Sequence, residues 1–353
     1  MFPCIEINLS KLKHNASTIL TLCEKQGISS CFLVTKMLAG DLKTASMLAT
    51  CGFSHLADSR IENLIKFKNI SLPKVLLRLP MLSEVKKVVK YCDISLNSEL
   101  LTIIKLNDAA LRQNKVHQII YMFDLGDLRE GHFYQDEYLE TIRIINQLLG
   151  IKLVGIGTNL TCYGGVIPTP SILNELLTIK RNIENTLNIS LPIISGGNSS
   201  SIFLLENQQL PKGINNLRLG ESIVLGRETA FGNPIANTFP DCFIVKAEII
   251  EVKIKPSYPL GVLGMNSFGE KPNIIDKGLM KRAILALGKQ DILPDNLTPL
   301  DPLVSIIGAS SDHLILDLGI SNYEVGDIIS FSVNYPGLLQ IMTSKYVKKE
   351  YVM

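Results

Sequence analysis

The strongest constraint on this fold is a regular alternation of short apolar runs with amphipathic stretches from residue 30 to about residue 225. Eight apolar runs occur, and a helix-like or turning segment follows each. They predict strands at Cys31–Lys36, Phe53–Ala57, Lys74–Leu79, Asp93–Leu96, Gln118–Leu125, Lys152–Asn159, Pro192–Ser195 and Asn215–Gly220. Continuous hydrophobicity is typical of strands buried on both faces of a parallel sheet. Eight such units predict a (β/α)8 barrel of the TIM type.

The segments between these runs carry the spacing of amphipathic helices. Helices are predicted at Leu42–Thr50, Arg60–Lys66, Glu99–Gln113, Asp136–Leu149, Ile172–Leu187 and Ser200–Asn207. A doubly wound open sheet is the main alternative for such a pattern. That fold is disfavoured because no G-x-G-x-x-G phosphate loop follows the first apolar run.

The pattern changes after about residue 235, where turn residues replace the helix-like segments. Strands are predicted at Phe243–Val252, Lys281–Gly288, Leu303–Gly308, His313–Leu318 and Asp327–Asn334. The alternating segment at the start of the chain also predicts a strand, which we assign to the same region. We therefore expect a barrel over residues 10–232, and a C-terminal all-β domain made of 233–353 together with 1–9.

Composition excludes several classes of partner. The net charge is +2 and no basic cluster occurs, so nucleic acid is not an expected partner. Seven scattered cysteines, with no Cys/His metal spacing, are typical of reduced thiols in a cytosolic protein. The sequence shows neither a targeting pattern nor an apolar run of about 18 residues. These features predict a cytoplasmic protein without a membrane partner.

Lys36 is the residue that first points to chemistry. Functional groups in such barrels collect at the carboxyl ends of the strands, and Lys36 closes the first apolar run. A buried ammonium group is costly unless it is paired or reacted. A lysine held there often has a lowered pKa and acts as a nucleophile toward carbonyl compounds. The alternative is a lysine whose head group reaches solvent along its alkyl stem.

Two further rim features favour a phosphorylated cofactor. The run SGGNSSS at 195–201 should gather backbone N–H groups at a helix start, which makes an anion site; a plain glycine-rich loop is the alternative. An anion site beside a reactive amine suggests pyridoxal 5'-phosphate, bound through Lys36. Arg218, if it faces the pyridine nitrogen, cannot protonate it because its own pKa exceeds about 12. A weakened electron sink favours proton exchange at Cα over transamination, whereas an ordinary surface ion pair would leave Arg218 without a role.

Six runs of this chain resemble the alanine racemase family of fold-type III pyridoxal-phosphate enzymes, and most closely its alanine/ornithine racemase branch. They are LADSRIENL, DLGDLREG, GTNLTCYGG, SGGNSSS, NNLRLGE and LGKQD. The resemblance covers nearly the whole chain. It implies an isomerase that interconverts L- and D-ornithine by two-base exchange of the α-proton. It also implies a homodimer whose active site is shared between subunits.

The resemblance assigns cofactor contacts to four rim side chains. Lys36 matches the Schiff-base lysine, although the aromatic-bearing segment that usually follows it is missing. Arg129 matches an arginine near the phenolic oxygen of the cofactor and near the substrate. Asn159 replaces a histidine that stacks on the ring, which is a departure from the family pattern. Arg218 matches the arginine that faces the pyridine nitrogen.

The phosphate contacts implied by the resemblance come from three segments. Ser199, preceded by Asn198, matches the phosphate-binding serine. The backbone of Gly220 and Glu221 matches the next contacts. Tyr335 matches a tyrosine that reaches the phosphate from the C-terminal domain.

The remaining implied residues lie in the β domain. Tyr258 is the nearest match to the second catalytic base, a tyrosine that the partner subunit delivers, but it comes early and Pro259 follows it. Ser311 and Asp312 match a segment that meets the substrate carboxylate. His313 is similar to a metal-binding histidine of related aldolases and dehydratases, but no second ligand accompanies it, so no metal site is expected.

Several alternatives stay open. They are an alanine or broad-spectrum amino-acid racemase, a D-amino-acid aldolase or dehydratase, and a non-catalytic pyridoxal-phosphate homeostasis protein. The last class is shorter and lacks the β domain. The sequence does not identify the acid that would pair with an ammonium group on the substrate side chain. The candidates are Asp58, Glu99, Asp127, Glu130 and Asp312.

Overall fold

The computed structural model describes residues 1–271 and 274–353, and the chain forms two compact units. One comprises Lys11–Pro240 and the other Met1–Ser10 with Asp241–Met353. Residues 233–240, which we expected in the β domain, belong with the barrel. They are held there by hydrogen bonds from Ile235 N–H to the carbonyl of Gly226 (2.9 Å) and from Asn15 Nδ2 to the carbonyl of Phe239 (2.8 Å).

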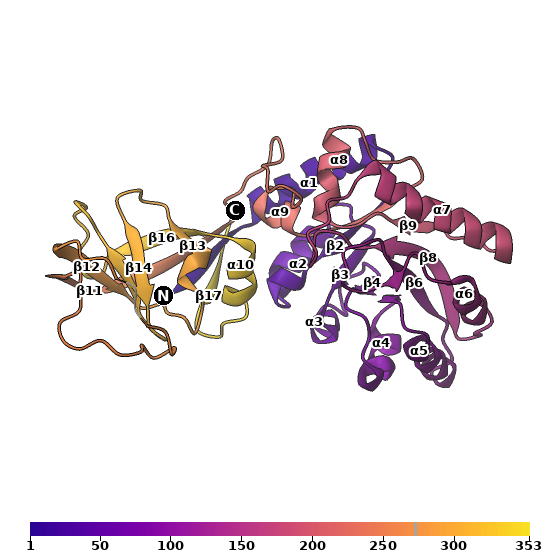
Figure 1. Cartoon of the computed structure of the whole chain (residues 1–353), viewed down its shortest axis with the longest axis horizontal. Coiled ribbons are helices and arrows are strands. Elements are labelled where there is room, and N and C mark those ends of the chain that lie inside the picture. The colour runs from indigo at the N-terminus through magenta and orange to yellow at the C-terminus, as the bar shows by residue number, and fades with distance from the viewer. Residues whose placement is uncertain (272–273) are drawn as a thin grey trace. The chain divides into compact units, whose positions relative to one another are not determined.

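The larger unit is a closed barrel of eight parallel strands, all at the predicted places (Figure 1). In spatial order they are β5 (Ile94–Asn97), β4 (Lys74–Leu76), β3 (His55–Asp58), β2 (Ser30–Val34), β10 (Asn216–Leu219), β9 (Ile193–Ser195), β8 (Ile151–Thr158) and β6 (His117–Asp124). Pairing of β5 with β6 closes the ring, and β7 (His132–Phe133) adds to β6. The predicted barrel fold is confirmed.

Helices surround this ring of strands (Figure 1). They are α1 (Leu9–Lys25), α2 (Leu42–Ala49), α3 (Ile61–Lys66), α4 (Val85–Tyr91), α5 (Leu100–Arg112), α6 (Leu139–Asn146), α7 (Pro170–Leu187), α8 (Ile202–Glu206) and α9 (Glu221–Leu225). Side-chain caps fix two of the starts. Asp41 Oδ1 accepts from Thr44 N–H (2.9 Å) before α2, and Thr169 Oγ1 accepts from Ile172 N–H (3.2 Å) before α7. The six predicted helices are present, and α1, α4 and α9 occupy segments for which we predicted no helix.

The first strand ends earlier than predicted. It stops at Val34, and Lys36 begins a short 3-10 helix, η1 (Lys36–Leu38). The cause lies in Thr35, whose φ of −111° and ψ of 3° take the backbone out of the β region. Lys36 therefore does not close the strand but lies two residues beyond its carboxyl end.

The smaller unit contains one eight-stranded sheet. Its strands are β1 (Cys4–Asn8), β11 (Phe243–Pro256), β12 (Leu279–Leu285), β13 (Leu297–Pro299), β14 (Ser305–Ala309), β15 (Leu314–Asp317), β16 (Ile328–Val333) and β17 (Lys348–Val352). The chain start joins it because β1 pairs with β11 antiparallel and with β17 parallel. The prediction of strands without helices needs one correction, since α10 (Tyr335–Ile341) follows β16. Asn334 caps α10, and a proline stands in its first turn.

All seven cysteines are free thiols. Among the described residues, no helix combines the length and the apolarity that crossing a bilayer requires.

Candidate active site

Lys36 lies half-buried at the carboxyl-terminal rim of the barrel. Burial lowers the pKa of its amine from the ordinary value for lysine, because water no longer stabilises the ammonium form. Arg129 lowers the pKa further, whereas Cys162, Asp58 and Glu221 oppose the shift. Asp58 is the last residue of β3, and Arg129, Cys162 and Glu221 follow β6, β8 and β10, so the closed ring brings all four groups around one amine.

Asp58 supports the segment that carries Lys36. Its carboxylate is fully buried, and Thr35 Oγ1 donates to its Oδ2 (2.8 Å). Its Oδ1 accepts from Arg60 N–H (2.9 Å) and from Asn63 Nδ2 (3.1 Å). Burial raises the pKa of Asp58, and these hydrogen bonds oppose the rise. Asp58 thus ties β3 to the residue that precedes Lys36.

Arg218 is the most deeply buried cation of the rim, with 3% of its surface exposed. Its Nη2 donates to the carbonyl of Thr158 (2.6 Å) and to Asn159 Oδ1, and its Nη1 donates to Ser195 Oγ. Burial lowers the pKa of Arg218 to about 10, so the guanidinium stays charged at neutral pH. The side chain lies on β10, the strand that pairs with β2.

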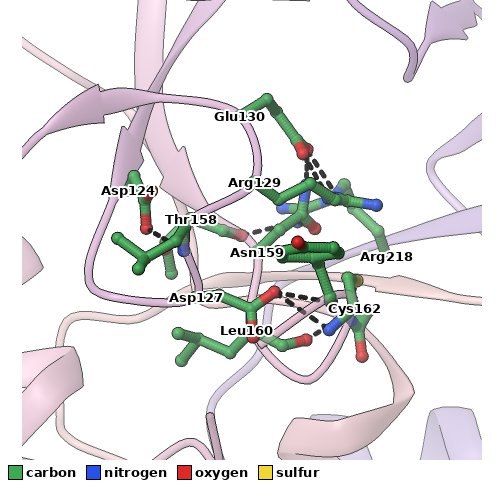
Figure 2. A network of polar contacts seen from close by, with 12 residues as sticks. Asp124, Asp127, Arg129, Glu130, Thr158, Asn159, Leu160, Cys162 and Arg218 are labelled. Carbon is green, nitrogen blue, oxygen red and sulfur yellow. Dashed lines mark hydrogen bonds and ion pairs between the residues drawn. The ribbon is translucent and has the colours of Figure 1, made fainter. Parts of the chain in front are cut away.

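A polar network joins Arg218 to Arg129 (Figure 2). The Glu130 carboxylate accepts from Arg129 Nη2 (2.6 Å) and contacts Arg129 Nε. The same carboxylate accepts from Asn159 Nδ2, and Asn159 Oδ1 accepts from Arg218. The network therefore runs from the loop after β6, through the end of β8, to β10. It brings three of the predicted side chains together.

Asp127 holds the 160–166 loop that follows β8. The backbone N–H groups of Cys162 (3.1 Å) and Tyr163 (2.9 Å) donate to its Oδ2, and that of Val166 (3.1 Å) donates to its Oδ1. Figure 2 shows this carboxylate facing the loop. Asp127 is 1% exposed. Asp127 is a candidate acid for a substrate ammonium group by sequence, but both of its carboxylate oxygens accept hydrogen bonds from the loop backbone.

Ser199 is the centre of the predicted phosphate site. It begins a short 3-10 helix, η3 (Ser199–Ser201), which leads into α8. Backbone N–H groups of Gly220 (3.5 Å) and Ser222 (3.1 Å) approach its Oγ, which donates to Ser222 Oγ (3.0 Å). Asn198 caps the turn by accepting from Ser200 N–H (2.8 Å). The barrel residues predicted to hold the phosphate, namely Asn198, Ser199, Gly220 and Glu221, are therefore neighbours.

Gly220 allows this cradle to approach the Lys36 segment closely. A Cβ at Gly220 would lie 2.6 Å from Met37 Cε and 3.0 Å from Val34 Cβ, so a larger residue would require Met37 and Val34 to shift. The side chain of the next residue, Glu221, accepts from Arg227 Nη2 (2.7 Å) and Nε (3.0 Å). Only the backbone of Glu221 is thus left for the predicted phosphate contact.

The β-domain candidates lie at loops and one helix start. Tyr258 follows β11 and is 41% exposed. Ser311 and Asp312 form the turn between β14 and β15, beside the LGKQD run: Gln290 N–H donates to the carbonyl of Ser311 (3.0 Å). Tyr335 is the first residue of α10. These residues belong to a different unit from the barrel rim. The contacts within each unit therefore do not bring the β-domain candidates together with the rim candidates.

The acids of the rim have different partners. Asp58, Asp127 and Glu130 are engaged as described above. Glu99 precedes α5 and lines a cavity of about 400 Å³, which Tyr121, His132 and Phe133 share. Among residues 1–271 and 274–353, no group of three or more His, Cys, Asp or Glu side chains could hold a metal ion.

The sequence interpretation missed one contact of each of two rim residues that it had named for other roles. Ser195 and Glu130 each bind a predicted arginine. Glu130 carried one available signal, because it directly follows Arg129 in the DLREG run. Ser195 carried none, since its contact with Arg218 depends on the pairing of β9 with β10.

Residues 7–228 match the family described as alanine racemase, N-terminal domain. Ornithine racemase from Acetoanaerobium sticklandii is 50% identical over 352 residues, with 99% of each chain covered. Lysine racemase from Thermotoga maritima is 40% identical over 354 residues, again with 99% of each covered. The alanine racemase from Bartonella henselae, solved with covalently bound pyridoxal phosphate, shares the fold with a TM-score of 0.72, 17% identity and 100% of each chain covered. This chain belongs to the alanine racemase family.

Proposed function

We propose that this chain is a pyridoxal-phosphate-dependent racemase that interconverts L- and D-ornithine. One observation carries the proposal for the chemistry: the adjacent strands β2 and β10 present Lys36 and Arg218, two cations that burial makes costly. Buried groups with shifted pKa values cluster at functional sites. The similarity to a protein named ornithine racemase, at 50% identity, supports the substrate.

The residues present fit the cofactor. Lys36 would hold its aldehyde carbon, Ser199 with the backbone of Gly220 and Glu221 would hold its phosphate, and Arg218 would face its pyridine nitrogen. The hydroxyls of Ser200 and Thr161 support this fit, because they are buried without a hydrogen-bond partner among the described residues. When bound, pyridoxal phosphate withdraws electrons from an attached amino acid and makes its α-proton acidic.

The side chains of this chain have separable tasks. Lys36, with its lowered pKa, accepts the proton from Cα on one face and can return it there. Arg218 keeps a permanent positive charge at the far side of the site, because its pKa of about 10 lies well above neutral pH. Arg129 offers N–H groups toward the substrate carboxylate and the phenolic oxygen. Asn159, which stands where the family has a histidine, connects the two arginines.

A second proton carrier is required on the opposite face, since one base alone would return the proton to the side it left. We propose the partner subunit's Tyr258 for this role, within a C2 homodimer. The partner subunit's Ser311 and Asp312 would meet the substrate, and Tyr335 would reach the phosphate. This part rests on the family resemblance. A cytoplasmic location is proposed on the seven free thiols.

The two similar racemases are both named for amino acids that carry a second amine on the side chain. We therefore expect ornithine to be turned over faster than lysine, and both faster than alanine. The test is incubation of the holoenzyme with each L-amino acid in deuterated water, followed by chiral analysis and mass spectrometry. Inversion of ornithine with deuterium at Cα supports the proposal. Rapid inversion of alanine with none of ornithine contradicts the substrate.

Two arms of the same experiment separate the other classes. A D-amino-acid aldolase or dehydratase needs a divalent metal, so activity that survives dialysis against a strong chelator excludes it. A homeostasis protein would bind the cofactor but exchange no α-proton. Bound pyridoxal phosphate with no deuterium uptake from any amino acid would therefore contradict racemisation.

A further inference from the structure

We propose that Glu130 is the positioning residue of the site: it holds Arg129 directly and orients Arg218 through Asn159. The proposal rests on the proposed function and extends it to a residue outside the catalytic pair. Figure 2 shows the Glu130 carboxylate close to the Arg129 guanidinium, with the Asn159 amide between it and Arg218. Sequence adjacency explains the contact with Arg129, but not the one with Asn159, which arrives from the end of β8.

The direction of each hydrogen bond in this network is fixed by chemistry. A guanidinium has no acceptor, so the oxygen of Asn159 must face Arg218. An ionised carboxylate has no donor, so the Asn159 amide nitrogen must face Glu130. Glu130 thereby selects one of the two amide orientations of Asn159. The selected orientation supplies Arg218 with its acceptor.

Charge balance gives Glu130 a second effect. Two guanidinium groups and the Lys36 amine surround this part of the rim, and Arg129 lowers the pKa of Lys36. Glu130 is 19% exposed, whereas the neighbouring Arg129 is 38% exposed, so water screens this carboxylate less than it would a fully exposed one. The charge of Glu130 also raises the pKa of Arg218. The carboxylate therefore reduces the positive potential around the cofactor site.

Glu130→Gln tests both effects. Oε1 of Glu130 accepts from both Arg129 and Asn159, and Oε2 contacts Arg129 Nε. In either amide orientation, the NH2 group of glutamine faces at least one of these donors and leaves it unpaired. We expect kcat/KM for ornithine to fall roughly 10- to 100-fold. The pH midpoint of the visible absorbance of the Lys36-bound cofactor should fall by about one unit, because an added positive potential disfavours the protonated form. The affinity of the apoprotein for pyridoxal phosphate is measured in the same preparations.

Several titratable groups other than Glu130 shift the pKa of Lys36, among them Cys162, Arg129, Asp58 and Glu221. None of the four is replaced in Glu130→Gln, so a shifted midpoint reports the lost carboxylate charge together with any displacement of Arg129 that follows from it. Glu130→Asp keeps the charge but shortens the arm. It should retain the parent midpoint and still lose part of kcat.

Two comparisons would distinguish a positioning role of Glu130 from a merely structural one. Glu140→Gln removes the same charge from an exposed pair with Arg143 on α6, and it should change neither the midpoint nor kcat. In an Asn159→Ala background, Glu130→Gln should add less to the loss of kcat than it does alone, because Asn159 transmits part of its effect. Additive losses in this cycle would contradict the route through Asn159.

The outcomes separate the two proposals. A parent protein that binds pyridoxal phosphate and racemises ornithine, together with a Glu130→Gln variant whose midpoint and kcat/KM equal the parent's, overturns the role of Glu130 alone. A parent that shows neither binding nor racemisation overturns the proposed function. A lower melting temperature with an unchanged midpoint would make Glu130 a structural residue and also overturn the inference.

Discussion

The barrel and the β domain organise their candidate residues to very different degrees. In the barrel, Arg218 is 3% exposed and donates to partners from two other strands and the loop that follows one of them. In the β domain, Tyr258 is 41% exposed. A buried side chain with several partners has lost its rotamer freedom on folding, whereas an exposed one keeps it until something covers it. The barrel thus preorganises its half of the proposed site, and we expect the β-domain residues to depend on a covering surface.

The largest effect should come from the centre of the preorganised half. Lys36→Ala removes the proposed cofactor anchor and one proton carrier, so racemisation should fall at least about 1000-fold. The visible absorbance of covalently bound cofactor should disappear as well. Both are measured on protein reconstituted with pyridoxal phosphate.

Lys87→Ala is the matched control, since Lys87 is an exposed lysine on α4. It should leave activity and absorbance unchanged. Persistence of the absorbance in Lys36→Ala would show that another amine binds the cofactor. Lys36 would then not be the centre of the proposed site.

The next largest effect tests the other side of the comparison. Tyr258→Phe removes only a hydroxyl, yet kcat should fall about 100-fold if that hydroxyl carries the second proton. Cofactor binding and absorbance should stay at parent levels, because no contact with the cofactor ring or phosphate is proposed for Tyr258. Deuterium exchange at Cα without inversion would be the signature of one remaining base.

Tyr346→Phe serves as the control, since Tyr346 is 68% exposed in the same unit. Equal kcat in Tyr258→Phe and the parent would remove Tyr258 from the mechanism. The β domain would then need a different donor.

The sequence could predict the features that leave a local pattern. The eight barrel strands were predictable because strands buried on both faces are continuous apolar runs, which is a local property. The first strand was predicted two residues too long, because the backbone turn at Thr35 leaves no trace in hydrophobicity. The helix α10 did leave a trace, an asparagine followed two residues later by proline, which is a typical helix start.

The site residues also divide into those with a local sequence signal and those whose contacts depend on the folded barrel. Lys36 and the 195–201 loop could be proposed because each stands at a predicted strand end. The task of Asp127 could not, since its three partners lie more than 30 residues further along the chain and meet it only in the folded barrel. Glu130 was considered only as a partner of the substrate, because its contact with Asn159 depends on how β6 and β8 align.

A smaller effect is expected where the preorganised network is weakened but its charge is kept. Arg218→Lys retains a cation, but an ammonium group cannot match the planar fork that reaches Thr158, Asn159 and Ser195. We expect about a tenfold loss of kcat/KM and a free energy of unfolding lower by roughly 2 kcal/mol, the cost of leaving buried acceptors unpaired. Urea denaturation and steady-state kinetics measure the two changes.

Arg181→Lys on α7 is the control, because Arg181 is exposed and bonds only within its own helix among the contacts observed (Nη2 to Thr178 Oγ1, 3.0 Å). Its unfolding free energy should match the parent's. If Arg218→Lys also matched the parent in both measurements, burial of Arg218 would not be what organises this half of the site.

The smallest effect should come from the loop support behind the network. Asp127→Asn keeps one acceptor oxygen for three backbone donors and turns an NH2 group toward at least one of them. The free energy of unfolding should fall by about 1 kcal/mol, and protease cleavage within the 160–166 loop should become faster, while the cofactor remains bound. Asp136→Asn, an exposed acid before α6, should change neither quantity. A parent-like cleavage rate in Asp127→Asn would mean that backbone contacts alone order the 160–166 loop. Buried side chains would then contribute less to the preorganisation of the barrel than the network around Arg218 indicates.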